Sequence, residues 1–146
     1  MGQQPNRLFA LAIAAAALFV AAGCTAGKPA TGVHESLVRV SERDFRISVQ
    51  PKRVPAGDVR ILVRNKGPVA HEFVVVHTGS SQLPLRADGL TVDEDEIEPE
   101  TVGILEPGAP GEVRELRLHL PPGRYELICN MSGHYLGGMH ADLVVG

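Results

Sequence analysis

The sequence predicts an all-β domain, a sandwich or a barrel, and three observations lead to this fold class. From Ser36 onward, short runs alternate apolar and polar residues, as in VRILVRN at 59–65. Turn-forming residues such as Gly, Pro and Asp separate these runs about every ten residues. No stretch from Ser36 onward carries the long apolar period of an amphipathic helix. This combination is typical of a domain built from short strands.

The expected strands follow one another in the order of the chain. Alternating or mostly apolar runs predict strands at 37–40, 45–49, 59–65, 71–77, 113–120, 124–129 and 141–145. The run HEFVVVH at 71–77 has apolar residues on both faces, which is typical of a central strand that is buried on both sides. Turn residues separate the strands at 51–58, 66–70 and 121–123.

The segment 78–111 does not fit the strand pattern and is too long for a plain loop in a compact domain. Within it, VDEDEIEPE at 92–100 predicts a short surface helix with Asp93 as its N-cap. TVGILE at 101–106 predicts a further edge strand. The acidic run at 93–100 is most often only a solvated surface, but such a run can also steer a basic partner such as a cytochrome.

Residues 1–23 predict an export signal that is not part of the fold. After Arg7, the apolar run LFALAIAAAALFV at 8–20 is shorter than the roughly 20 residues that a transmembrane helix needs, and its length suits a signal peptide. AAGC at 21–24 resembles the bacterial lipobox, although Ala21 stands where Leu is commoner.

The resemblance to a lipobox implies cleavage before Cys24 and a lipid on Cys24, which would anchor the protein to a membrane. Ordinary signal cleavage nearby, or an uncleaved anchor, would also export the domain. We therefore expect an extracytoplasmic protein on the periplasmic or cell-surface side. It would have a flexible tether at 24–35 and one folded domain at 36–146.

Composition argues against one class of function and draws attention to one cysteine. The chain has 146 residues, which suits a single domain, and its formal net charge of −3 argues against nucleic-acid binding. Its cysteines are Cys24 and Cys129. If Cys24 carries lipid, Cys129 has no disulfide partner. A free thiol in an exported protein needs a function or a buried position.

The segment CNMSGHYLGGMH at 129–140 gathers several kinds of metal ligand. Blue-copper sites use two His and one Cys in a plane, with a weak Met on the axis. Cys129 ends an expected strand, His134 follows on a loop, and Met139 precedes the last strand. Glycines allow this loop to turn closely. The pattern favours copper over zinc, because a thioether ligand suits copper and a catalytic zinc would need a general base and a cleft.

A second histidine ligand has to come from outside this loop, and the strand at 71–77 offers one at each end. His71 and His77 lie about 20 Å apart on an extended strand, so one ion cannot bind both. If this strand pairs antiparallel with the strand that ends at Cys129, His71 is the nearer histidine. If the pairing is parallel, His77 is nearer.

His71 together with the spacing C-x4-H-x4-M resembles the cupredoxins, the plastocyanin and azurin group of blue copper proteins. The lead-in GRYELIC is also similar to the family, and the resemblance covers 36–146. It implies a cupredoxin-like Greek-key β-sandwich or barrel in which 78–111 is a flap inserted between strands. It further implies one copper ion, cycling between Cu+ and Cu2+, with the ligands His71, Cys129, His134 and Met139.

The resemblance also implies a role for each residue of the loop. The thiolate of Cys129 would be the strong ligand and the main electron path, and Met139 would be a long axial ligand that tunes the potential. His134 would present an edge to solvent, and we expect a redox protein partner, such as a cytochrome, an oxidase or a reductase, to dock near it. Met131 and Leu136 would exclude water from the site.

One residue departs from the family pattern. The position after the first histidine is often Asn in the family, where it braces the cysteine loop, and this chain has Glu72 there. Whether Glu72 braces the loop is left open by the sequence. Among the other candidate ligands, His140 should point away from whatever Met139 faces, and His119 should face water, because each lies in an alternating strand.

The leading hypothesis is an extracytoplasmic type 1 (blue) copper protein that carries single electrons between redox partners and is not an enzyme. The alternative on the same fold is a copper-binding module for delivery, sensing or storage. A third hypothesis is the electron-accepting part of an oxidase or reductase complex. The complete Cys/His2/Met set favours electron transfer, because a carrier that releases copper needs a more open site.

Overall fold

The structure is a computed structural model that describes residues 1–2, 34–79 and 82–146. Cys24, and nearly all of the expected signal segment and tether, lie outside the described residues. Export and lipid anchoring therefore stay predictions. Within the described ranges, no helix has the length and apolar character needed to traverse a lipid bilayer.

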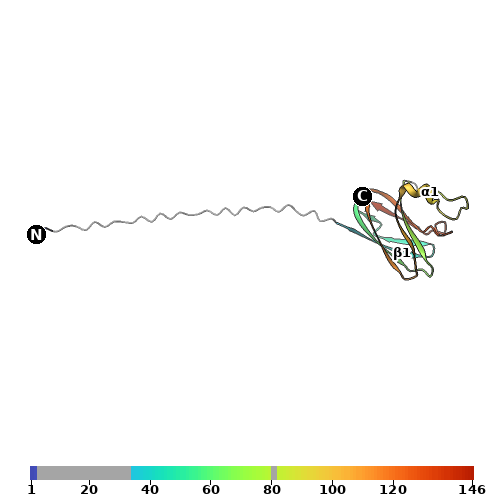
Figure 1. Ribbon diagram of the computed structural model, residues 1–146, viewed down its shortest axis with the longest axis horizontal. Helices are drawn as coiled ribbons and strands as arrows, with labels where there is room; N and C mark the ends of the chain where they lie inside the picture. Colours follow the sequence, from blue (N-terminus) through green and yellow to red (C-terminus); the bar gives the residue numbers. More distant parts are fainter. Residues whose placement is uncertain (3–33, 80–81) are drawn as a thin grey trace. The chain divides into compact units, whose positions relative to one another are not determined.

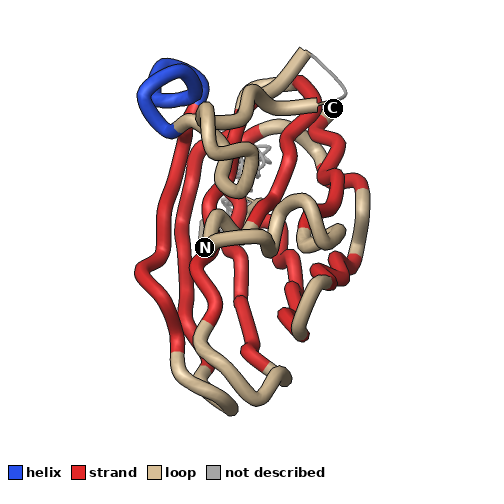
Figure 2. Tube along the Cα trace, turned by 90° about the vertical axis from the view of Figure 1, so that its right-hand side faces the viewer, coloured by secondary structure: helices blue, strands red, loops and turns tan. Residues whose placement is uncertain are grey.

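Nine strands and one short helical segment make up the described part of the unit from Gly32 to Gly146 (Figure 1). The strands are β1 (Ser36–Arg43), β2 (Arg46–Gln50), β3 (Arg53–Val54), β4 (Gly57–Asn65), β5 (His71–His77), β6 (Thr101–Gly108), β7 (Val113–Leu120), β8 (Gly123–Ile128) and β9 (His140–Val145). The helical segment consists of α1 (Glu94–Ile97) and the 3-10 turn η1 (Glu98–Glu100). Figure 2 shows the helical segment outside the layers of strands.

The strands form two sheets. One sheet has the order β2-β1-β4-β7 and the other has the order β3-β9-β8-β5-β6. The neighbours β1 and β4 are parallel, whereas β5 is antiparallel to both β6 and β8. In the β5–β8 pair, Val74 lies opposite Ile128 and His77 lies opposite Tyr125. This register brings His71, and not His77, to the end of β8. The expected two-sheet β-sandwich is confirmed.

The main core fills the space between the two sheets, and the alternation in the sequence supplies its side chains. In β4, Val59, Ile61 and Val63 are buried. They belong to one cluster with residues of the other sheet, such as Phe73 and Leu127. Burying each such side chain contributes about 1.5–3 kcal/mol. This packing fixes the two sheets, and hence the ends of their strands, relative to each other.

A second, smaller core lies on the other face of the five-stranded sheet. It joins residues of the sheet and the loop after β8 to residues of the segment that follows β5: Val74, Val76, Ile128, Tyr135, Leu83, Val92 and Ile97. Strand β5 is therefore buried on both faces, as the sequence predicts. The helix α1 begins after Asp93, whose carboxylate accepts a hydrogen bond from the N–H of Asp95, and β6 is an edge strand. Both features agree with the sequence analysis.

The turn between β1 and β2 differs from the expected strand at 45–49. Asp44 and Phe45 form a two-residue turn, with Arg43 opposite Arg46, and β2 begins only at Arg46. Phe45 has a φ of 58° and its side chain is 52% exposed. A bulky residue in the left-handed region is unusual. The alternating pattern was misleading here, because the first apolar residue of the run lies in the turn and not in the sheet.

The end of β1 carries a buried carboxyl group that the apolar pattern did not predict. The side chain of Glu42 is fully buried and accepts a hydrogen bond from the guanidinium of Arg114, which also donates to the backbone oxygen of Glu106. Burial removes water from the carboxylate and raises the pKa of Glu42 from 4.5 to about 7, against the opposing attraction of Arg114.

The pKa of Glu42 predicts how stability changes with pH. Between pH 4.5 and about 7, the folded protein keeps a proton on Glu42 that the unfolded chain has released. The free energy of unfolding should therefore fall as the pH rises through this window. Urea denaturation at both ends of the window measures the slope, and Glu42→Gln should reduce it. Glu96→Gln, at an exposed position of α1, is the control and should leave the slope unchanged; equal slopes in both variants would contradict the assignment.

Candidate metal centre

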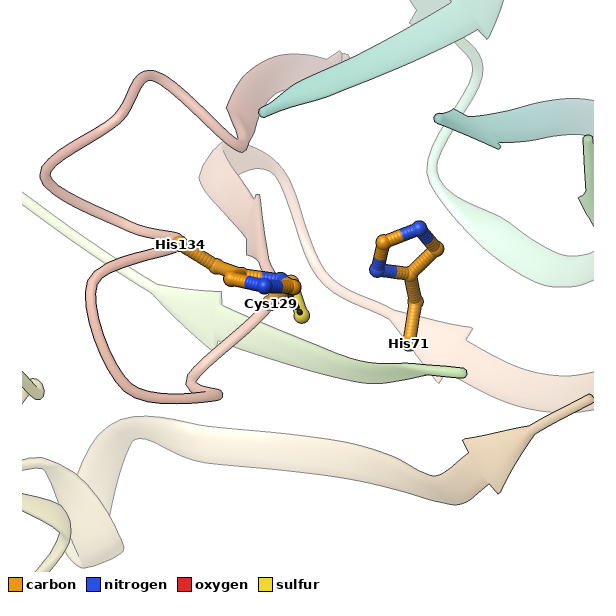
Figure 3. Close-up of side chains that lie close together, drawn as sticks. All are labelled: His71, Cys129 and His134. Carbon is orange, nitrogen blue, oxygen red and sulfur yellow. Dashed lines mark hydrogen bonds between the residues drawn. The ribbon is translucent and has the colours of Figure 1, made fainter. Parts of the chain in front are cut away.

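Three side chains that are far apart in the sequence meet at one end of the β5–β8 pair. His71 is the first residue of β5, Cys129 directly follows β8, and His134 lies on the loop that leads to β9. One candidate ligand atom from each lies within 4.8 Å of the other two. Figure 3 shows the two imidazole rings on either side of the thiol. The group can hold a metal ion, and the strand register alone accounts for bringing His71 to Cys129.

Cys129 is a buried free thiol. Its Sγ lies 3.4 Å from Nδ1 of His134. Burial raises the pKa of the Cys129 thiol, while backbone hydrogen bonds from Met131 and Glu72 lower it. Those two backbone groups aim at the sulfur, so they would also stabilise a thiolate bound to a metal ion. The site thus shields the thiol from solvent and still offers donors to its charged form.

His71 is completely buried, and neither of its ring nitrogens has a partner in hydrogen-bond geometry among the described residues. One nitrogen points toward Cys129 and His134, and the other points away (Figure 3). The second is Nε2, which lies 3.2 Å from a carboxylate oxygen of Asp44. A buried nitrogen without a partner is costly, so Nδ1 of His71 is suited to a ligand that the three residues would share.

Burial also decides the charge of His71. It lowers the pKa of the imidazole, and the nearby His134 lowers it further, while the carboxylate of Asp44 acts in the opposite direction. The neutral imidazole is the form that binds a metal ion. The surroundings of His71 therefore favour the ligating form.

The loop between β8 and β9 is closed by its own backbone. The N–H of Cys129 donates to the carbonyl oxygen of Met139 at 3.1 Å, and the N–H of Met139 donates to the carbonyl oxygen of His134 at 2.9 Å. Gly133 and Gly138 have φ values of 77° and 98°, which only glycine adopts without strain. The tight loop that the glycines predicted is present, and it holds His134 over Cys129.

Met139 is completely buried and belongs to the same core cluster as Cys129. Its backbone is hydrogen-bonded to the backbones of Cys129 and His134. Its role as an axial ligand stays a prediction. Met131 packs against this cluster, as expected, whereas Leu136 is 51% exposed and forms part of the surface.

Three further histidines of the strands lie away from the metal centre. His77 packs against Tyr125 at the far end of β5, with ring centroids 4.8 Å apart. His140 faces away from the site and pairs with Glu126 at 3.0 Å. His119 is exposed and pairs with Asp58 at 2.8 Å. These positions fit the expectation that none of the three is a ligand.

Glu72 lies beside the cysteine loop. Burial and the nearby carboxylates of Glu94 and Glu106 raise the pKa of Glu72, whereas the backbone of Asn130 lowers it. The side chain of Asn130 then reaches the flap: it accepts from the N–H of Val92 at 2.7 Å and donates to the carboxylate of Glu94 at 2.7 Å. Asn130 therefore connects the cysteine loop to the flap, and Glu72 lies next to that connection.

Two residues near the centre were missed by the sequence analysis. Asp44 lies against Nε2 of His71, and the ring of Phe45 meets the ring of His134 edge-on, with centroids 5.3 Å apart. Asp is a common turn residue, but nothing in the sequence indicates that the turn between β1 and β2 reaches the ligands. That proximity arises only from the stacking of the two sheets.

Comparisons with known proteins point to one fold. No family model matches the chain, and no curated protein matches its sequence. Among solved structures, dithionite-reduced auracyanin from the photosynthetic bacterium Roseiflexus castenholzii matches with a TM-score of 0.57 and 21% identity, over 79% of this chain and 99% of that one. Auracyanin A from Chloroflexus aurantiacus, described as a "blue" copper protein, matches with a TM-score of 0.56 and 20% identity, over 77% and 100%.

Rusticyanin from Thiobacillus ferrooxidans matches with a TM-score of 0.57 and 17% identity, over 76% of this chain and 78% of that one. These proteins are cupredoxins. The chain therefore has the cupredoxin fold, and the resemblance seen in the sequence is confirmed at the level of the fold.

The packing around His71 predicts the effect of one added methyl group. A Cβ at Gly67 would lie 2.7 Å from Nε2 of His71 and 2.9 Å from a carboxylate oxygen of Asp44. Gly67→Ala should therefore displace the imidazole and weaken metal binding by about 10- to 100-fold. Titration with Co2+ or Cu2+ against a competing chelator measures the change. Gly79→Ala is the matched control, because its Cβ would meet nothing within 4 Å. Equal affinities in the two variants would contradict the placement of His71.

Proposed function

We propose that this protein is an extracytoplasmic type 1 copper protein that carries single electrons between redox partners and catalyses no reaction of its own. The observation that carries the proposal is the group of His71, Cys129 and His134, in which His71 and Cys129 are buried and the candidate ligand atoms lie within 4.8 Å of one another. The cupredoxin fold supports it, as does the description of a protein of the same fold as a blue copper protein.

The donor set fits copper. Two imidazoles, one thiolate and the thioether of Met139 match the ligands of blue-copper sites, and the buried nitrogens of His71 lack a partner among the described residues. Bound copper would supply a couple between Cu+ and Cu2+. The protein holds the donors in place before the ion arrives: His71 by the strand β5, and Cys129 and His134 by the hydrogen-bonded loop. A fixed donor set keeps rearrangement small when an electron arrives or leaves.

An electron would enter and leave through His134, which is the partly exposed member of the group. Apolar side chains that are roughly half exposed lie on the segments that contact the loop: Phe45, Leu90 and Leu136. Such a surface suits brief contact with another protein, because it can be desolvated quickly without separating ion pairs. We expect a cytochrome, an oxidase or a reductase to dock here.

The alternative, a module that delivers, senses or stores copper, is less well supported by the geometry. A delivery site has to give up its ion to a partner, whereas here His71, Cys129 and Met139 are each completely buried. A third role, as the electron-accepting part of a larger oxidase or reductase complex, would use the same centre and the same surface near His134.

Copper binding is tested by colour. Cys129→Ser should abolish the intense blue absorption of the copper(II) protein while the sandwich stays folded, because a hydroxyl forms no thiolate bond to copper. Absorption and circular dichroism spectra measure the two properties. His77→Ala is the matched control and should stay blue, since His77 lies at the far end of β5. A colourless wild-type copper(II) form would overturn the proposed function.

Membrane anchoring is proposed to depend on Cys24. Cys24→Ala, expressed from the full sequence, should lose the lipid and shift the protein from the membrane fraction to the soluble extracytoplasmic fraction. Mass spectrometry should detect acyl chains on the wild type and on the control variant Thr25→Ala. It should detect none on Cys24→Ala. Continued retention of Cys24→Ala in membranes would contradict lipidation at this residue.

A further inference from the structure

The turn between β1 and β2 approaches the metal centre from the opposite sheet. It consists of Asp44 and Phe45, and each contacts one of the two histidines of the centre. The turn therefore lies across the pair of imidazoles, whose ring centroids are 5.2 Å apart. Neither strand of the hairpin contributes to the group of candidate ligands.

Asp44 faces the side of His71 that is turned away from Cys129. Its carboxylate oxygen lies 3.2 Å from Nε2, within reach of a hydrogen bond after a small rotation of a side chain that is partly exposed. A carboxylate beside Nε2 keeps the proton on that nitrogen, which leaves the lone pair of Nδ1 directed at the other ligands. Its negative charge also makes the imidazole a stronger donor. Gly67 makes room for the contact, because a Cβ there would strike both groups.

Phe45 faces His134. Its ring meets the imidazole edge-on, and a Cβ on Gly137 would lie only 2.2 Å from its Cδ1. The ring thus fills the space between the loop and the hairpin and limits rotation of the His134 ring. Phe45 keeps this position with a φ of 58°, a conformation that suits glycine and is strained for a bulky side chain. Phe45 is half exposed, so burial of its ring contributes little to stability. Its contact with His134 therefore explains better than core packing why an aromatic residue occupies this strained position.

We propose that the Asp44–Phe45 turn is a positioning element for both histidine ligands, in which Asp44 orients and polarises His71 and Phe45 holds His134 over the thiol. The inference rests on the proposed copper function. Asp44 favours the copper(II) state, because its charge strengthens donation to the more highly charged ion. Phe45 slows the release of copper, because His134 cannot turn away from the site.

The first test needs no copper. In the copper-free protein, ¹⁵N NMR should find the proton of His71 on Nε2, and Asp44→Ala should produce a mixture of both tautomers. Asp58→Ala is the matched control, because Asp58 also pairs with a histidine, His119. Asp58 lies at the start of β4, whereas Gly67, which contacts His71, follows the end of β4. The same tautomer in all three proteins would overturn the role of Asp44, whatever the outcome of the colour test above.

The second test uses the copper-loaded protein. Asp44→Asn should lower the affinity for copper(II) about tenfold and leave that for copper(I) unchanged, which raises the reduction potential by about 59 mV for one electron. Asp58→Asn should leave the potential unchanged. If Asp44→Asn shifts it no more than this control, the carboxylate does not act on the ligand.

The third test separates the ring of Phe45 from its strain. Phe45→Gly relieves the left-handed backbone, so the copper-free protein should unfold at a denaturant concentration no lower than that of the wild type. It should nevertheless lose copper to a chelator about tenfold faster. Phe45→Leu, which keeps an apolar side chain but no ring, should show an intermediate rate. Unchanged release in Phe45→Gly would overturn the role of Phe45.

Discussion

The antiparallel pairing of β5 with β8 is the constraint on which the rest of the site depends. Because Val74 lies opposite Ile128, the end of β8 points toward the start of β5, and Cys129, which directly follows β8, comes near His71. A parallel pairing would have brought His77 there instead. Because β5 is buried on both faces, its position is fixed by two cores at once. The sheet therefore determines the positions of His71 and Cys129. The loop after β8 then adds His134 to these two residues.

Burial acts on the two innermost side chains to the same end. It raises the pKa of the Cys129 thiol and lowers the pKa of the His71 imidazole, so both groups are uncharged when no metal ion is present. An isolated charge in this position would be costly. A metal ion would favour the thiolate of Cys129, because the ion takes the place of the proton on the sulfur. The backbone donors of Met131 and Glu72 would then stabilise that thiolate. The protein thus stays stable without its ion while remaining ready to bind it.

How much the sequence predicts depends on whether a feature is local or arises from stacking. The run at 71–77 and the alternation at 113–120 predict β5 and β7 to the residue, because side chains on one face of a strand share one environment. The ligand spacing from Cys129 to Met139 is local in the same sense. The expected start of a strand at Phe45 was wrong, because this apolar residue belongs to a turn. The burial of Glu42 was not predicted, because its partner Arg114 lies on a strand that is distant in the sequence.

The order of the strands has a consequence for how the protein is made. His71 lies on β5, whereas Cys129 and His134 follow β8, so no part of the chain before β8 contains even two of the three donors. Synthesis from the N-terminal end therefore delivers the thiol late, after β1 to β8 have emerged. Until β8 docks against β5, Cys129 is open to oxidants and to unwanted metal ions. The pairing of β8 with β5 therefore shields the thiol as well as placing it beside His71.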